Sequence, residues 1–414
     1  MLDVLRGFAL FGVFYSNLNL WFSGRMFLPP EHVKALMSSN ANAVAGFLFR
    51  FFVFGKFITI FAFLFGLGFA IQLYRAEARG ASIVPVYLRR LIAMLLIGAA
   101  HLLVLWYGDI LHVYALAGLS LLLVRRQGDR ALILYGVALS LLMPLVALAV
   151  ERFLPLLTRS GEEAEAAAKA TMDRLDAVRD ASLAGFASRS YLTAMRASVA
   201  YYLVQFFTLG SFAPTIASVA GKFFLGLVAG RRLIIQEAAR HLGIFRRLLA
   251  VGLVAGVLGN GTMALLRYLF RHDIIKPTAT WTFAIPSIVE IGDLGFATVY
   301  VAGLCLLFQR PRARRALLAL APVGRMALTN YLAQSAVSIC IFYGFGLGLI
   351  GALGPIPCFG ITALVFGAQM IASRLWLSRF RFGPAEWAWR SMTYGKAQPM
   401  RAAPARSEEL PMSA

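Results

Sequence analysis

Long runs of apolar residues decide what this chain can fold into. The runs at 132–148 and 359–372 contain no charged residue, and only 14% of the whole chain is charged, against about 25% in a soluble domain. A soluble protein of 414 residues has too little interior to bury this much apolar surface, so we expect the chain to lie in a lipid bilayer. Lipid gives the backbone no hydrogen-bond partner, and the runs lack the alternation of a barrel strand. They therefore predict membrane-spanning helices.

The length of the runs predicts the number of spans. One helical span needs about 20 apolar residues, which predicts an all-α, polytopic membrane bundle of about ten helices. The predicted spans lie near residues 5–23, 48–73, 90–107, 110–124, 131–150, 201–229, 248–269, 286–308, 318–346 and 355–377.

Arginine clusters between the spans predict the orientation of the chain. They fall at 75–90, 125–130, 231–247 and 310–315, which is every second loop. Positively charged loops stay in the cytoplasm, so both termini are predicted to be cytoplasmic. The same clusters account for the net charge of +21, and we expect no nucleic-acid partner.

The chain is expected to form one transmembrane bundle over residues 1–397. Its largest extramembrane piece, near 151–200, contains a stretch of mixed charge with helical character, which predicts a partly helical extracytoplasmic loop. Residues 398–414 predict a disordered cytoplasmic tail. The three cysteines lie in apolar segments without metal-ligand spacing, so we expect no metal site.

Polar side chains inside a bilayer are costly, so those within the predicted spans are the candidates for function. The first span carries Arg6 at its inner end and Asn17 about 16 Å farther along the helix. An arginine there suits a phosphate-bearing ligand from the cytoplasm. The alternative is a positively charged anchor and an amide that joins two helices.

The third span carries His101, with Asp109 at its outer mouth. Their spacing of eight residues puts them near one helix face, where a histidine can act as a general base and a carboxylate can orient it. A straight helix separates them by about 12 Å, so direct contact requires a kink at Gly108 or a partner from another helix. A structural hydrogen-bonding role is the alternative for His101.

Further side chains near this pair are candidates as well. His112 is close enough to Asp109 in sequence to assist it. Trp106 and Tyr114 are expected either to form a platform for a sugar ring or to pack at the membrane interface.

Polar residues also follow the inner half of the ninth predicted span. Arg325 and Thr329 are four residues apart, as are Asn330 and Gln334, so a continuous helix would carry one polar stripe. Such a stripe must face protein or water, where it either lines a cofactor site or joins helices.

Lys56 begins the apolar run of the second span at its outer end. It is expected either to snorkel to the headgroups or to face a central cavity. The tripeptide Gly-Lys-Phe at 55–57 recurs at 221–223, which is too short to establish a duplication.

The chain resembles the YeiB-like family of bacterial inner-membrane proteins over essentially its whole length. An opening signature, three span motifs and a C-terminal signature carry the resemblance. In this sequence they read Leu2-Asp3-Val4-Leu5-Arg6-Gly7 through Asn17, Lys56-Phe57 through Phe63-Leu64-Phe65-Gly66, His101 with Trp106-Tyr107-Gly108-Asp109-Ile110-Leu111, Val323-Gly324-Arg325-Met326-Ala327-Leu328-Thr329-Asn330-Tyr331 and Gly383-Pro384-Ala385-Glu386-Trp387-Ala388-Trp389-Arg390. The family implies a multi-pass inner-membrane protein and brings no settled function.

The Arg6-Gly7 pair with Asn17 is more distantly similar to the first span of transmembrane acyltransferases. These include the acyltransferase-3 proteins and the lysosomal heparan-glucosaminide acetyltransferase. The resemblance implies transfer of an acyl group from cytoplasmic acyl-CoA to a sugar across the membrane. Where acyltransferase-3 proteins have a histidine, this chain has Asn17, as the heparan-type relatives do. Asparagine is no base near neutral pH, so a catalytic histidine must come from elsewhere, and His101 is the best placed.

These observations favour a transmembrane acyltransferase with acyl-CoA as co-substrate and an extracytoplasmic acceptor such as a glycan. The expected catalytic and CoA-binding residues are His101, Asp109, Asn17, Arg6, Arg325 and Asn330. The expected acceptor-binding residues are Trp106, Tyr114, Lys56 and Gln334. The alternative is a transporter or flippase for a small polar or lipid-linked solute, whose path the same side chains would line.

Overall fold

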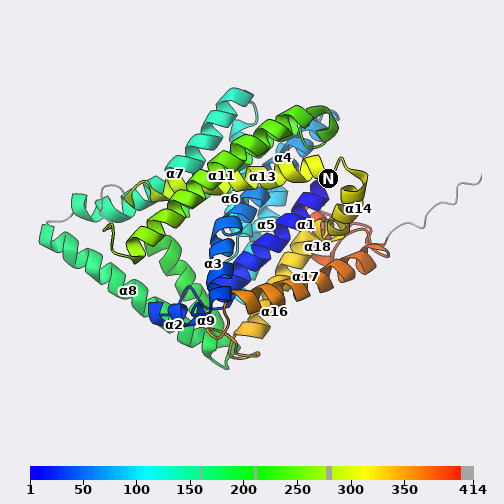
Figure 1. Ribbon diagram of the computed structural model, residues 1–414. Helices are drawn as coiled ribbons and strands as arrows, with labels where there is room; N and C mark the ends of the chain where they lie inside the picture. The colour runs from blue at the N-terminus through cyan, green and yellow to red at the C-terminus, as the bar shows by residue number, and fades with distance from the viewer. Residues whose placement is uncertain (159–160, 209–211, 277–281, 402–414) are drawn as a thin grey trace, which may run out of the picture.

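The computed structural model describes residues 1–158, 161–208, 212–276 and 282–401. Within these ranges every regular element is a helix, which confirms the predicted helical membrane bundle (Figure 1). The elements are α1 (Leu2–Ser16), the π-helix η1 (Asn17–Phe22), α2 (Pro30–Leu36), α3 (Asn40–Phe52), α4 (Lys56–Glu77), α5 (Val84–Val104), α6 (Leu111–Val124), α7 (Asp129–Thr158), α8 (Gly161–Ala187), α9 (Tyr191–Leu203), η2 (Val204–Thr208), α10 (Phe212–Arg231), η3 (Ala238–His241), α11 (Leu242–Arg271), α13 (Ile285–Leu307), α14 (Pro311–Leu317), η4 (Leu318–Leu320), α15 (Ala321–Arg325), α16 (Ala327–Phe342), α17 (Pro355–Leu377) and α18 (Pro384–Tyr394).

The number of spans depends on how the shorter helices are counted. In the described part of the chain, seven helices are long and apolar enough to cross a membrane, or eight if one sharply bent pair forms a single span. α1 has 15 residues before the π-helix begins, and α6 has 14. The chain is therefore a multi-pass membrane protein, and the count of about ten spans stays a prediction.

The ninth predicted span is not one helix. Two helical segments, 311–325 and 327–342, meet at Met326 with a bend of 77°. Arg325 therefore lies exposed at the end of α15, whereas Thr329 lies on α16. The expectation that both belong to one helical stripe was wrong, because a run of apolar residues does not reveal a break in the helix.

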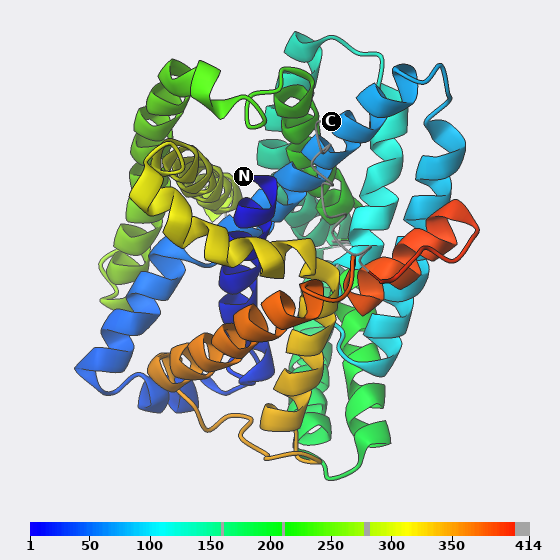
Figure 2. The same ribbon diagram turned by 90° about the vertical axis from the view of Figure 1, so that its right-hand side faces the viewer.

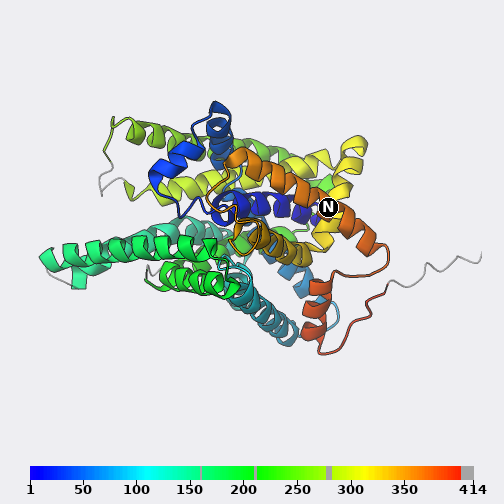
Figure 3. The same cartoon turned by 90° about the horizontal axis from the view of Figure 1, so that it is seen from below.

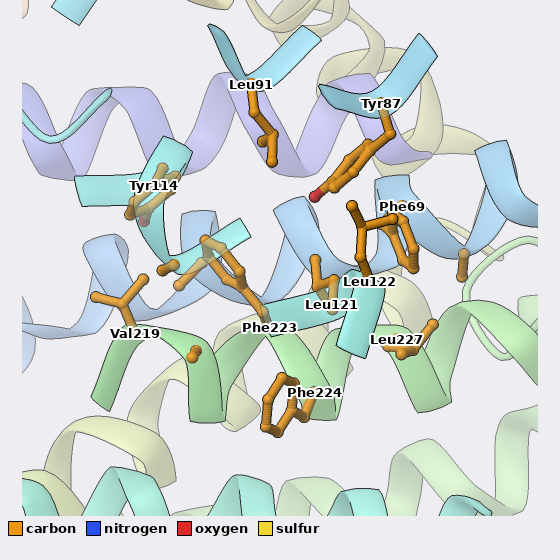
Figure 4. Close-up of a cluster of buried hydrophobic side chains, with 14 of the residues drawn as sticks. Phe69, Tyr87, Leu91, Tyr114, Leu121, Leu122, Val219, Phe223, Phe224 and Leu227 are labelled. Atoms are coloured by element: carbon orange, nitrogen blue, oxygen red, sulfur yellow. The ribbon is translucent and has the colours of Figure 1, made fainter. Parts of the chain in front are cut away.

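α4 and α10 pack against each other in the middle of the bundle through small residues. A side chain on Gly66 would collide with the backbone of Phe223, and one on Gly226 would collide with the backbone of Phe63. Close approach of this kind is typical of membrane helices, where dispersion contacts hold the pair together. Tyr114 and Leu227 belong to the apolar core around this contact (Figure 4).

The arginine-rich loops gather at one end of the bundle, called the arginine end below. Arg231 donates a hydrogen bond to the carbonyl of Gln127, and Trp389 of α18 donates one to the carbonyl of Arg90. α1 starts at this end and runs through the middle of the bundle, beside α16 and α17 (Figure 2). At the opposite end, called the far end, the amide of Gly351 donates to the carbonyl of Ser23.

α8 covers the stretch that was expected to be helical and extends from one side of the bundle (Figure 3). The predicted tail is only partly described. Its first residues fold back, since Trp387 Nε1 donates to the carbonyl of Gln398 and Phe380 pairs with Arg401. The remainder of the predicted tail, from residue 402, lies outside the described residues.

Candidate functional site

A turn after α5 brings Asp109 back onto His101. The helix ends at Val104, and the amide of Trp106 donates to the carbonyl of His101. The distance between Nδ1 of His101 and Oδ1 of Asp109 is 2.9 Å. The sequence predicted that contact would need a kink at Gly108 or a partner from another helix, and the structure shows that the helix ends before Gly108.

Gly98 on α5 makes room for this turn. A Cβ atom there would lie 2.7 Å from Oδ2 of Asp109 and 2.7 Å from the amide nitrogen of His112. Any side chain at this position would push the start of α6 away from α5. The glycine therefore sets the distance at which His101 and Asp109 meet.

The pair is part of a longer hydrogen-bonded chain, called the relay below. Oδ2 of Asp109 accepts from the amide of His112 at 2.9 Å and lies 2.7 Å from its Nδ1. Nε2 of His112 lies 2.8 Å from the hydroxyl of Tyr202 on α9. At the other end, Nε2 of His101 lies 2.8 Å from Oγ of Ser335 on α16. The relay thus runs Ser335–His101–Asp109–His112–Tyr202 across four helices and a turn.

Simple donor counting assigns the protons of the relay. An ionised carboxylate only accepts hydrogen bonds, so Asp109 requires a proton on Nδ1 of each histidine. Each neutral imidazole then offers Nε2 as an acceptor. With both imidazoles neutral, the hydroxyls of Ser335 and Tyr202 donate to these nitrogens. Oγ of Ser335 also lies 3.4 Å from the carbonyl of Tyr331, a second acceptor for its proton. Both histidines are therefore oriented as bases whose Nε2 faces a hydroxyl group.

The relay is shielded from solvent. His101 is 2% exposed, and the other four side chains are buried as well. The ring of Tyr331 packs on His101 at 5.0 Å, and the ring of Trp106 lies 6.4 Å away. A low dielectric strengthens the hydrogen bonds along such a chain.

Asn17 lies at the start of the π-helix η1. Segments of π-helix are rare and frequently mark functional sites. The same π-helix packs on the turn below His101, because the ring of Phe22 lies 4.3 Å from that of Trp106 and Trp21 contacts Tyr107. The segment of Asn17 is therefore a neighbour of the relay.

The two aromatic residues expected to bind a sugar are used in packing. Trp106 is 1% exposed, and the hydroxyl of Tyr114 donates to the carbonyl of Ile58 at 3.1 Å. Neither ring faces open space in this conformation. A role as a sugar platform stays a prediction.

Asn330 and Gln334 join α16 to α17. Gln334 Nε2 donates to Oε1 of Gln369 at 2.9 Å, and Gln369 Nε2 donates to the carbonyl of Asn330 at 3.0 Å. Asn330 Nδ2 donates to Oγ of Ser373 at 2.9 Å. These contacts agree with the helix-joining alternative, and a role in binding a cofactor stays a prediction.

Glu386 of α18 holds the start of α16. Its carboxylate accepts hydrogen bonds from the amide of Leu328 at 2.7 Å and from the hydroxyl of Thr329 at 2.6 Å. A carboxylate at a helix N-terminus satisfies donors that the helix leaves free. Burial nevertheless raises the pKa of Glu386 above its usual value. Two separate family motifs, the one around Thr329 and the C-terminal signature, thus meet in one contact that orients the helix of Ser335.

The arginines expected to bind CoA lie at the arginine end. Arg6 pairs with Asp3 at 2.8 Å and is partly exposed. Gly324 packs directly against the backbone of Asp3, so Arg325 follows a close contact between α15 and α1. The two helices that carry Arg6 and Arg325 therefore touch. Sharing of one ligand by these arginines stays a prediction.

Lys56 does not snorkel. It is 1% exposed, and its Nζ lies 2.7 Å from Oδ1 of Asp293 on α13 and 2.7 Å from Oδ1 of Asn260 on α11. That part of the prediction was wrong, because an acidic partner from a distant helix neutralises the lysine. A role of Lys56 in binding the acceptor stays a prediction.

The second Gly-Lys-Phe tripeptide repeats this arrangement. Lys222 of α10 pairs with Glu290 of α13 at 2.8 Å, one helical turn from Asp293. Lys56–Asp293 and Lys222–Glu290 are called the lysine pairs below. The sequence shows both tripeptides, but no local pattern in it marks their carboxylate partners. Ser335 and Tyr202 were missed for the same reason.

In the part of the chain that the structure describes, no three His, Cys, Asp or Glu side chains are placed to hold a metal ion. The two histidines of the relay direct Nδ1 at a shared carboxylate instead.

The curated relatives match this chain over nearly its whole length. Residues 229–396 match a family described as "Protein of unknown function (DUF418)". Over 97% of its length the chain is 33% identical to 95% of the uncharacterized protein YxaH of Bacillus subtilis (strain 168). It is 27% identical to the uncharacterized protein YeiB of Escherichia coli (strain K12), over 96% of this chain and 97% of that protein. No solved structure matches it significantly. The 33% identity to YxaH, which extends over nearly the full length of both chains, shows that the chain belongs to the YeiB-like family of membrane proteins.

Proposed function

We propose that this protein is a transmembrane acyltransferase of the bacterial inner membrane. It would take an acyl group from cytoplasmic acyl-CoA and transfer it to a hydroxyl or amine of an extracytoplasmic acceptor such as a glycan. The observation that supports this proposal is the buried chain Ser335–His101–Asp109.

Acyl transfer requires a base that removes a proton from the attacking group. His101 offers Nε2 as that base, while Asp109 holds the required tautomer and stabilises the imidazolium that forms. Oγ of Ser335, 2.8 Å from Nε2, marks the position of an oxygen nucleophile. In the direct route the acceptor hydroxyl takes the place of the Ser335 hydroxyl next to Nε2 of His101. It then attacks the thioester carbonyl, which Asn17 polarises. CoA leaves as a thiolate and takes its proton from His101.

The donor would enter from the arginine end. Arginine loops face the cytoplasm by the positive-inside rule, which puts both termini there. Arg6 and Arg325 would hold the CoA phosphates, since a guanidinium matches phosphate geometry. Arg90 and Arg390 add positive charge at the same end, where Arg6 and Arg390 both act on Arg90 electrostatically.

Binding of the donor can be tested without knowledge of the acceptor. The detergent-purified protein is melted with and without CoA and acetyl-CoA, beside Arg6→Ala and the exposed control Arg79→Ala. A ligand at about 100 times its Kd stabilises the fold by about 2.7 kcal/mol. We expect this shift in the wild type and the control and its loss in Arg6→Ala. Absence of any shift with several acyl-CoAs, in folded protein, would refute the proposal.

The chemical step is tested by the release of the CoA thiol in the presence of candidate acceptors. His101→Ala is expected to lower the rate by about 10²–10⁴-fold, as for loss of a general base. Ser335→Ala separates the direct route from an acyl-serine route, in which Oγ of Ser335 itself attacks the thioester and then passes the acyl group to the acceptor. If the direct route holds, the variant keeps most of its activity. If the acyl-serine route holds, the variant loses activity and is not labelled during incubation with radioactive acyl-CoA.

Two observations favour a second candidate, a transporter or flippase for a small polar or lipid-linked solute. The helix broken at Met326 and the buried lysine pairs are both typical of transport proteins. Solute flux into proteoliposomes that needs no acyl donor and survives His101→Ala would support this function over the first.

A further inference from the structure

A second polar region lies beside η1, toward the far end. It is a small cavity between η1, α2 and α3, with a volume of about 50 Å³. Its polar walls are Asn19, Arg25 and Arg50, and Phe49 and Met37 are among its apolar walls. One water molecule needs roughly 10–15 Å³ in such a cavity, so the space admits a small ligand. No residue of the relay lines it.

Two of these polar side chains are buried with groups left unused. Asn19 is 0% exposed, and within the described residues neither its Nδ2 nor its Oδ1 has a hydrogen-bond partner. Arg25 is 6% exposed and donates from Nε to the carbonyl of Asn19 at 2.6 Å, while its Nη1 has no partner there. Unsatisfied buried polar groups are rare and call for an explanation.

The charge of the cavity wall is positive. Arg25 and Arg50 are close enough to act on each other electrostatically, and Arg271 acts on Arg50 in the same way. Over the ranges given above, neither Arg25 nor Arg50 forms an ion pair with a carboxylate, and no acidic residue lines the cavity. The cavity wall therefore carries two guanidinium groups and no carboxylate.

We propose that this cavity binds a small oxyanion, a carboxylate or a phosphate group. Nη1 of Arg25, Nδ2 of Asn19 and the guanidinium of Arg50 donate to its oxygens. Guanidinium groups match the geometry of these two anions, and an ionic partner satisfies the buried donors. The anion is either free in solution or part of a lipid headgroup. Because Asn19 belongs to η1, the bound anion also braces the π-helix that packs on Trp106.

The proposal is tested by titration of the lipid-depleted, detergent-purified protein with sodium phosphate or acetate. Sodium chloride at equal ionic strength is the reference. We expect saturable binding of an oxyanion and about 10- to 100-fold weaker binding in Arg25→Met, the cost of one charge-assisted hydrogen bond. Arg79→Met at the arginine end serves as the matched control and keeps the wild-type affinity.

A second variant covers the case in which Arg25→Met fails to fold. Asn19→Leu removes an unsatisfied buried amide, so it is expected to melt no lower than the wild type without ligand and to bind the oxyanion more weakly. Nanodiscs identify the source of the anion. Selective retention of phosphatidylglycerol over phosphatidylcholine, lost in Asn19→Leu, assigns a lipid headgroup, whereas binding of phosphate or acetate without lipid assigns a soluble anion. Neither kind of binding, or equal binding by all variants, overturns the proposal.

Discussion

The relay and the lysine pairs both bury charge in the same bundle, but they balance it in different ways. In each lysine pair a carboxylate faces an ammonium group, as at Lys56 and Asp293, 2.7 Å apart. In the relay, the carboxylate of Asp109 is held by N–H groups of two imidazoles and a backbone amide. A lysine pair is a closed contact between opposite charges. A chain of imidazoles and hydroxyls can pass a proton from one group to the next.

This difference suggests a structural role for the lysine pairs and a chemical role for the relay. The lysine pairs join α4 and α10 to α13, and their net charge is zero. Gly55 supports the contact, since it adopts a φ of +86° and a side chain there would strike the carboxylate of Asp293. We infer that variants of the lysine pairs change stability first, whereas variants of the relay change activity first.

The largest effect is expected from Lys56→Met. The substitution leaves Asp293 buried without its cation, which costs about 3–5 kcal/mol of stability, whereas removal of both charges is often neutral. The double variant Lys56→Met/Asp293→Leu should therefore recover most of the loss. Thermal melting in detergent measures both. If Lys56→Met is no less stable than the double variant, the charge of Lys56 is not needed to stabilise the buried Asp293.

Asp109→Asn tests the relay. An asparagine cannot accept from all three N–H donors, so one imidazole loses its orientation, and acyl transfer should fall at least about 10²-fold. The matched control is Lys222→Met, which removes a buried charge outside the relay and should leave the rate per folded molecule unchanged. Equal loss of activity in the two variants would erase the distinction between the regions.

Tyr202→Phe removes the hydroxyl at the end of the relay that lies away from Ser335. Loss of one hydrogen bond to Nε2 of His112 is expected to cost about 0.5–1.5 kcal/mol of stability and far less activity than Asp109→Asn. Melting curves and the thiol-release assay check both parts. An activity loss as large as that of Asp109→Asn would move the reacting base from His101 to His112.

The smallest effect concerns Glu386, outside both regions. Its raised pKa means that the folded protein holds the proton more tightly than the unfolded chain does. This contribution to stability is present at low pH and is lost as the pH rises through the raised pKa. Relative to Glu386→Gln, the wild type should therefore lose stability as the pH rises from about 4.3, the usual pKa of glutamate, through the raised pKa of Glu386. A relative gain would mean that the helix N-terminus outweighs burial.

The sequence by itself determined the membrane bundle and most helix positions, because span length and apolar composition are local properties. It also identified His101 and Asp109, since a titratable residue inside an apolar run stands out without any neighbour. The break at Met326 escaped it, because the apolar residues between Ala316 and Val323 and those after Met326 can be read as one continuous span.

Only the tertiary structure decided what these residues contact. Ser335 lies 234 positions from His101 in the chain, and Lys56 lies 204 from Asn260. Such hydrogen bonds depend on where a helix ends and on which glycines let helices approach, as at Gly98. The unused donors of Asn19 and Arg25 are likewise invisible in sequence, because a missing partner is a property of the packed fold.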